Sequence, residues 1–190
     1  MKRIIALWLA ALMLAAQPVQ AAVCVGFGQS STCSTVEDSI GATDDTFGSG
    51  STESFIGSKF TTDADGVTVC KISAKIYKNS SLTSDFVMEI RADNADLPSS
   101  TILATSETVA NSVVGTDLAG TYVDFVFTIP QALSGSTSYW AMLKKVSPST
   151  YALSWRFGND SPEHVVRGDG DATYTDLTTS RAATMILYKQ

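Results

Sequence analysis

Hydrophobic and polar residues alternate along much of this chain with the two-residue period that is typical of β-strands. The clearest example is residues 67–78, where the apolar and polar side chains fall on opposite faces: Cys70, Ile72, Ala74 and Ile76 on one, and Lys71, Ser73 and Lys75 on the other. A strand of this kind presents one face to a core and the other to solvent. The pattern therefore predicts a half-buried strand in a sheet.

Several further segments show the same period and are separated by short turn signals rich in Gly, Asp, Asn and Pro. The predicted strands are residues 55–60, 67–78, 86–91, 102–105, 107–113, 122–129, 138–146, 151–157 and 182–188. Residues 93–98 and 158–171 are predicted loops. No window keeps a helical period over three turns. The pattern predicts an all-β fold, a two-sheet antiparallel β-sandwich of the jelly-roll-like kind.

The first 21 residues have the organisation of a cleavable signal peptide. Lys2 and Arg3 are followed by an apolar run over residues 4–16, and then by Pro18 and small residues up to Ala21. The run is shorter than the roughly 18–20 residues that span a bilayer. We expect cleavage after Ala21 or Ala22, a secreted protein in an extracellular or periplasmic location, and no membrane insertion after cleavage.

The remaining chain divides into two parts by composition. Residues 22–54 are rich in Ser, Thr and Gly, and we expect an irregular segment with one short strand at most. Residues 55–190 carry the strand pattern of the sandwich. The exported compartment favours disulfides, and the short spacing of Cys24 and Cys33 favours a bridge between them, with Cys70 a buried thiol. Pairing of Cys70 with Cys24 or with Cys33 is the alternative.

The net charge of the chain is −6. Lys2 and Arg3 would leave with the signal peptide, which gives 11 basic and 19 acidic residues, or −8, for residues 22–190. An acidic chain gains nothing from a phosphate backbone, so nucleic acid is not an expected partner.

We expect no enzymatic activity and no catalytic residues. His164, the only histidine, stands in a polar stretch without a nucleophile motif nearby. Glu89 and Asp124 are candidates for a carboxylate pair, but Glu89 and Arg91 share a strand face, which favours a surface ion pair.

No metal site and no cofactor are predicted from the cysteines and the histidine, because their spacing does not suit zinc. Two acidic loops, residues 93–96 and 169–171, are candidates for a structural calcium ion, since Ca²⁺ takes several oxygen ligands. Turn chemistry explains both loops equally well, because Asp, Asn and Gly suit tight turns.

Aromatic side chains near the least regular part of the chain are the candidate ligand-binding residues: Trp155, Tyr151 and Tyr174. Binding residues concentrate in loops, and the apolar faces of sugar rings pack on aromatic rings. For Trp155, a place in the core is the alternative.

The central part of the chain resembles the "choice-of-anchor" type β-sandwich domains of secreted and surface proteins of bacteria, with similar modules in phage-associated proteins. The segments that carry the resemblance are residues 87–94, 97–106, 122–127 and 133–143. The resemblance implies a jelly-roll-like sandwich similar to carbohydrate-binding modules, with no established catalysis.

The sequence therefore favours an exported, non-catalytic binding or adhesion module for a glycan or another surface polymer. The alternative is a structural subunit of an extracellular or surface assembly that associates with itself, and a hydrolase is a weaker second alternative.

Overall fold

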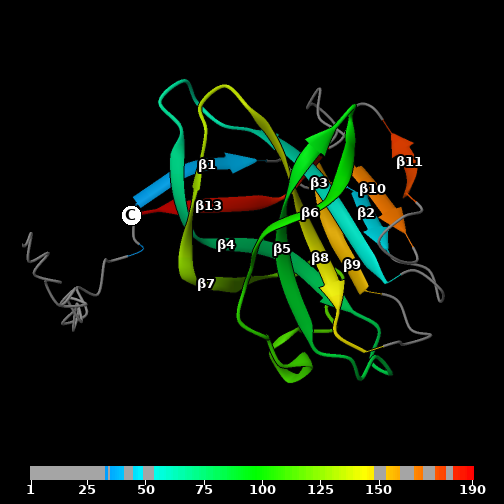
Figure 1. Cartoon of the computed structure of the whole chain (residues 1–190). Helices are drawn as coiled ribbons and strands as arrows, with labels where there is room; N and C mark the ends of the chain where they lie inside the picture. Colours follow the sequence, from blue (N-terminus) through cyan, green and yellow to red (C-terminus); the bar gives the residue numbers. More distant parts are fainter. Residues whose placement is uncertain are drawn as a thin grey trace, which may run out of the picture. The chain divides into compact units, whose positions relative to one another are not determined.

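Alternating side chains place the strands in two antiparallel sheets that pack face to face (Figure 1). The computed structural model describes residues 33, 35–40, 45–48, 54–147, 153–158, 165–168, 174–178 and 182–190. Residues 31–190 belong to one compact unit. The predicted leader, residues 1–21, lies outside the described residues.

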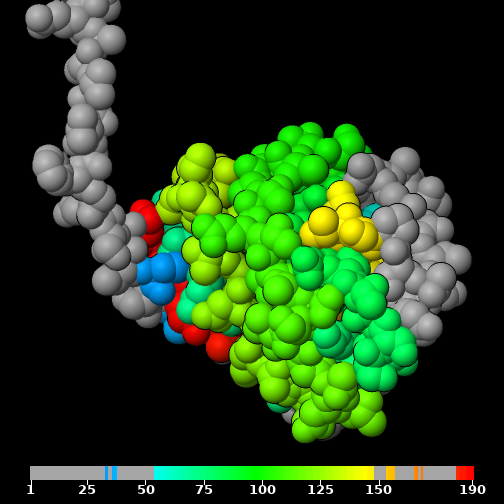
Figure 2. Space-filling model, turned by 90° about the horizontal axis from the view of Figure 1, so that it is seen from below, coloured from blue at the N-terminus to red at the C-terminus, as the bar shows by residue number. Residues whose placement is uncertain are grey.

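The first sheet has seven strands and is built around one long central strand, β4. Its strands are β1 (Thr35–Ile40), β2 (Asp45–Gly48), β4 (Val67–Lys78), β7 (Thr121–Leu133), β9 (Leu153–Gly158), β12 (Ala182–Ala183) and β13 (Met185–Lys189). Strand β4 pairs with β7, β13 and β9, so three strands distant in sequence depend on it. Strand β1 pairs with β13, and their blue and red residues lie together in Figure 2.

The second sheet has six strands in the order β11-β10-β3-β8-β5-β6. They are β3 (Phe55–Thr61), β5 (Phe86–Asn94), β6 (Leu97–Thr105), β8 (Ser138–Lys145), β10 (Val165–Gly168) and β11 (Tyr174–Thr178). In a flat sheet the two outer strands would lie about 24 Å apart, at about 4.8 Å per strand. Strands β6 and β11 are nevertheless in contact. The sheet is therefore strongly curled.

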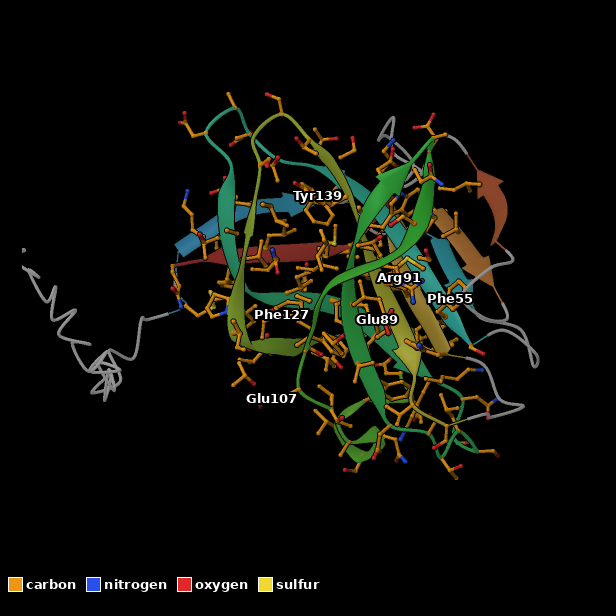
Figure 3. The ribbon with its side chains drawn as sticks, viewed as in Figure 1. Phe55, Glu89, Arg91, Glu107, Phe127 and Tyr139 are labelled. Atoms are coloured by element: carbon orange, nitrogen blue, oxygen red, sulfur yellow. A yellow bond between two sulfur atoms is a disulfide. The ribbon has the colours of Figure 1, made fainter. Side chains whose placement is uncertain are left out.

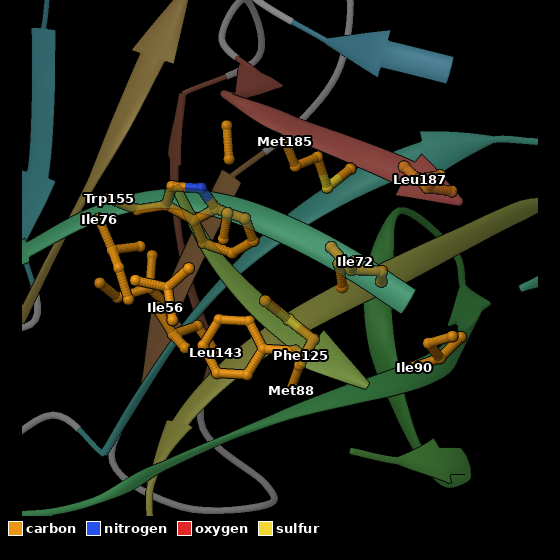
Figure 4. Close-up of a cluster of buried hydrophobic side chains, with 14 of the residues drawn as sticks. Ile56, Ile72, Ile76, Met88, Ile90, Phe125, Leu143, Trp155, Met185 and Leu187 are labelled. Carbon is orange, nitrogen blue, oxygen red and sulfur yellow. The ribbon is translucent and has the colours of Figure 1, made fainter. Parts of the chain in front are cut away.

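The main core lies between the two sheets and is filled by the inward side chains of both (Figure 4). Phe125, Ile72 and Trp155 enter from the seven-stranded sheet, and Met88 and Leu143 enter from the other. Each of these side chains is fully buried. Burial of a side chain of this size stabilises a fold by about 1.5–3 kcal/mol.

A second, smaller cluster lies on the opposite, concave face of the six-stranded sheet. Phe55, Trp140, Met142 and Val166 form it, and each is at most 2 % exposed. Gly57 leaves room on this face for Met142, because a Cβ atom at position 57 would lie 2.3 Å from the Met142 sulfur and the methionine would have to shift. The curled sheet thus has a core on each side.

The structure confirms the predicted all-β, two-sheet antiparallel sandwich. Among the described residues the only helix is a short 3₁₀ turn, Asn111–Val113, and none forms a helix long and apolar enough to cross a membrane. This 3₁₀ turn falls within the strand predicted over residues 107–113, where Val109 makes a single β-bridge to Phe86. That strand prediction was wrong.

The predicted loop over residues 93–98 is a tight hairpin turn between β5 and β6. Asn94 pairs with Leu97, and Ala95 and Asp96 both have positive φ values, 51° and 65°. Two-residue hairpin turns need this conformation and usually carry Asn-Gly or Asp-Gly. Because the turn residues here are Ala95 and Asp96, the sequence lacks the usual signal for a two-residue hairpin. The predicted polar loop over residues 158–171 likewise contains strand β10.

Strands β1 and β2 fall within residues 22–54 and pair with β13 and β9, so this segment contributes two strands to the sandwich where one at most was expected. The predicted Cys24–Cys33 bridge is also wrong. Cys33 forms a disulfide with Cys70 on β4, across a separation of 37 residues. Cys70 is 3 % exposed. It is buried, as predicted, but it is half of a disulfide and not a free thiol. A disulfide is compatible with an extracellular location.

Loss of this disulfide should lower the free energy of unfolding by roughly 3–4 kcal/mol, because a closed loop of this length restricts the unfolded chain. In urea unfolding, Cys33→Ala and Cys70→Ala should lose equal amounts of unfolding free energy. A reducing agent should not lower the stability of either variant further, because the Cys33–Cys70 disulfide is already absent from both. Cys24→Ala is the matched control and should keep the stability of the parent chain. A loss in Cys24→Ala as large as in Cys33→Ala would contradict the pairing.

Candidate functional site

An open groove lies at the end of the sandwich where the β5–β6 hairpin approaches the β7–β8 turn. Its volume is about 670 Å³, within the range of ligand-binding clefts. The lining residues are mostly small and polar: Ala92, Asp93, Leu103, Gln131, Ala132, Ser134, Ser136, Thr137, Ser138 and Tyr139. Tyr139, near the upper end of the sheet in Figure 3, marks its position. The groove offers hydroxyl, amide and carboxylate groups together with apolar surface.

One wall of the groove, the β7–β8 turn, is fixed against the neighbouring β3–β4 turn. The hydroxyl of Thr62 donates a hydrogen bond to the Ser134 carbonyl over 2.6 Å. Gly135 permits this close approach, because a Cβ atom there would lie 1.9 Å from the Ala64 carbonyl oxygen. Any larger residue at position 135 would push the two turns apart.

Ser136 shows how firmly this wall is held. Its φ is +49°, in the left-handed region that residues other than glycine rarely adopt. The Ser136 N–H donates to the Asp63 carbonyl over 2.9 Å, which secures the conformation. The Ser134 N–H donates in turn to the Tyr139 hydroxyl over 2.9 Å. A wall held in this way loses little conformational freedom when a ligand binds.

Of the groove-lining residues that the structure describes, Asp93 is the only charged one, and several protein groups surround its carboxylate. The Trp140 indole N–H donates to Asp93 Oδ1 over 2.7 Å, and the Lys59 ammonium lies 3.5 Å from the same oxygen. The Asp96 N–H contacts Asp93 Oδ2 at 3.4 Å. Lys59 also forms an ion pair with the Asp96 carboxylate. The lysine therefore bridges the two carboxylates of the hairpin.

This bridge argues against the calcium site considered for residues 93–96, because the Lys59 ammonium lies where a cation would have to bind. Burial by itself lowers the pKa of Lys59, but hydrogen bonds and charges from Asp96 and Asp93 outweigh burial and raise it. Lys59 is therefore charged at neutral pH. The described residues contain no group of three His, Cys, Asp or Glu side chains that could hold a metal ion. The other acidic loop, residues 169–171, lies outside the described residues.

A second charged cluster is buried on the concave face of the six-stranded sheet. Arg91 and Glu89 lie close together on β5, and the Arg91 Nε–H donates to Glu89 Oε2 over 2.8 Å (Figure 3). The Lys144 ammonium approaches Glu89 Oε1 at 3.2 Å. The predicted Glu89–Arg91 pair is confirmed, but its predicted surface location is wrong, since the two residues are 4 % and 1 % exposed.

Asp124, the other candidate carboxylate, lies on β7 in the seven-stranded sheet and forms a separate cluster. Lys71 donates to Asp124 Oδ2 over 3.0 Å, and the Ser73 hydroxyl donates to Oδ1. Burial by itself raises the pKa of Asp124, but the hydrogen bonds from Ser73 and Lys71 and the charge of Lys71 lower it overall. Glu89 and Asp124 are on different sheets, so the structure does not join them in one site.

Trp155, the central residue of the predicted stacking site, is in the main core. It is 0 % exposed, and its indole N–H donates to the Thr184 carbonyl over 3.0 Å. A fully enclosed ring cannot stack on a ligand, so this prediction was wrong. Tyr151 lies outside the described residues, as does His164. Tyr174 begins strand β11, but its side chain is not among those described.

Sequence patterns did not reveal the groove, because its residues come from three separate segments and none is rare or strongly charged. The signal that could have located it is the turn sequence Ser134-Gly135-Ser136-Thr137-Ser138 between two clear strands. A run of small hydroxylated residues at a hairpin offers hydrogen-bond donors and acceptors. Such residues do not pack in the core, so these groups are open to contact a ligand.

No family model matches the chain, and no curated protein is detectably similar to it. The resemblance to the choice-of-anchor type domains therefore stays a prediction.

Replacing Glu89 with Gln should lower the free energy of unfolding by roughly 3–5 kcal/mol, because the charges of Arg91 and Lys144 would lose a buried counterion. The matched control is Glu107→Gln. Glu107 is exposed and accepts a hydrogen bond from Thr128, so its loss should amount to about 1 kcal/mol or less. Chemical denaturation measures both. Equal losses of unfolding free energy in the two variants would show that the buried cluster contributes no more to stability than an exposed carboxylate.

Proposed function

We propose that this chain is an exported, non-catalytic binding module that holds a glycan or a similar hydroxyl-rich surface polymer in the groove. The observation that carries the proposal is the lining: an open cleft of about 670 Å³ with mainly uncharged hydrogen-bonding side chains. Sugars present hydroxyl groups that both donate and accept hydrogen bonds. Ser, Thr and Gln side chains offer the same two capacities in return.

Two further features support binding over hydrolysis. Hydrolysis of a glycoside normally uses two carboxyl groups roughly 5–10 Å apart, and the lining contains one, Asp93. The groove wall is also held rigidly by its contacts with the β3–β4 turn, so little ordering cost opposes a ligand. Export is inferred from the leader, and the disulfide supports it.

Filling the groove should abolish ligand binding without disturbing the fold. Ala132 is exposed in the lining, and in Ala132→Trp the indole would occupy the space of the ligand. We expect at least a tenfold loss of affinity for any polysaccharide retained in pull-down or glycan-array assays. The matched control, Ala119→Trp, changes an exposed alanine in the turn before β7 and should bind as the parent does. Equal binding by both variants would exclude the groove as the site.

The alternative function is that of a structural subunit, and one observation favours it. Tyr122, Val126 and Ile129 on strand β7 are 51 %, 42 % and 82 % exposed. Exposed apolar residues on an edge strand are suited to association between subunits.

If the chain assembles through β7, sedimentation velocity should show larger species as its concentration rises, and Val126→Lys should abolish them. The matched control is Val113→Lys, at a valine that is 61 % exposed in the 3₁₀ turn; this variant should assemble normally. A monomer at every concentration would exclude the structural alternative.

A further inference from the structure

We propose that the groove selects uncharged glycans, and that Lys59 confers this selectivity by acting as a built-in counterion. The inference rests on the proposed function and specifies the ligand class of the same site. Three features of the structure carry it: a lining in which Asp93 is the one charged residue among those described, the protein contacts of the Asp93 carboxylate, and the restrained position of Lys59.

The first feature is the chemistry of the lining. Apart from Asp93, the described residues of the lining include no acidic residue and no lysine or arginine. A ligand with carboxylate or sulfate groups would therefore find no cation in the groove wall to replace the water around its charges. It would instead meet the negative charge of Asp93. Removing a charge from water without a partner is costly, so acidic glycans are disfavoured.

The second feature is that protein groups already surround Asp93. Oδ1 accepts from the Trp140 indole and lies 3.5 Å from the Lys59 ammonium, while Oδ2 contacts the Asp96 N–H. A ligand with an ammonium group, such as an unacetylated amino sugar, would have to displace Lys59 to reach this carboxylate. The energy gained from pairing the ligand ammonium with Asp93 would be offset by the loss of the Lys59–Asp93 pair. Cationic glycans therefore gain no advantage over neutral ones.

The third feature is the restraint on Lys59. Its side chain is 13 % exposed, and it extends from β3 across β8 to reach two carboxylates on the β5–β6 hairpin. An ammonium group held by Asp93 and Asp96 together is not free to turn into the groove and attract anions. Its positive charge offsets the negative charges of Asp93 and Asp96 on the β5–β6 hairpin. The groove therefore presents hydroxyl-bonding groups with little net attraction for either sign of charge.

The test compares three oligosaccharides of equal length on the intact chain: a neutral hexose oligomer, a hexuronic acid oligomer and an unacetylated glucosamine oligomer. Isothermal titration calorimetry or a glycan array should show that the neutral oligomer binds at least tenfold more tightly than the other two. Its affinity should change less than twofold between low and high salt, because screening affects only charged partners. These measurements need no variant.

Lys59→Gln tests the role of the lysine directly. Without Lys59, the hairpin loses the cation that lies between Asp93 and Asp96, and the ratio of glucosamine-oligomer to neutral-oligomer affinity should rise at least tenfold. Lys75→Gln makes the same charge change on β4 in the other sheet, and its ratio should match that of the parent. Lys59→Arg keeps the charge and should also keep the parent ratio, which separates loss of charge from loss of packing.

The outcomes distinguish the two proposals. If the parent chain binds the acidic or the cationic oligomer as tightly as the neutral one, or if Lys59→Gln leaves the ratio unchanged, the selectivity proposal is wrong while the groove stands as a glycan site. If none of the oligomers binds, or if Ala132→Trp binds them like the parent, the proposed function is wrong and the selectivity proposal falls with it.

Discussion

Burial of both faces of the six-stranded sheet is the constraint on which the rest of the structure depends. Its inner face packs against the seven-stranded sheet, and its concave face encloses Trp140, Met142 and a charged cluster. A sheet curled this far brings its own side chains over one another, so polar groups on the concave face are removed from water and need protein partners. Glu89, Arg91 and Asp93 all lie on this face. The groove lies beside this face, at the end of the space between the two sheets, where Tyr139 and Leu103 border the main core.

The same constraint explains why the polar groups fall into two kinds. Deep on the concave face, Glu89 and Arg91 pair with each other and are closed to any ligand. At the rim, Asp93 keeps part of its surface exposed while Trp140 and Lys59 hold it in place. The two kinds differ in exposure, because Glu89 and Arg91 are 4 % and 1 % exposed whereas the side chain of Asp93 is 22 % exposed. The hydroxyl groups of the β7–β8 turn lie near Asp93 and line the groove with it.

The sequence predicted the sandwich and most of its long strands, because the period of two over residues 67–78 and 122–129 is strong. It missed β1, β2, β10 and β11, which are short and rich in polar residues, and it missed the β5–β6 hairpin, whose turn lacks glycine. The site could not be predicted in the same way. Burial of Trp155 depends on which strands pair across the sheet, and the Cys33–Cys70 bond depends on the path of the chain before β4.

The pairing of the first strand with the last also has a consequence for the order of folding. Thr35 is paired with Lys189, and β13 lies between β1 and β4 in the sheet. Strand β1 therefore has no partner until the C-terminal strand has been synthesised and has docked on β4. Contacts between residues so distant in sequence form slowly. The domain cannot be completed segment by segment in chain order, and β1 has no partner strand until residues 185–189 have been synthesised.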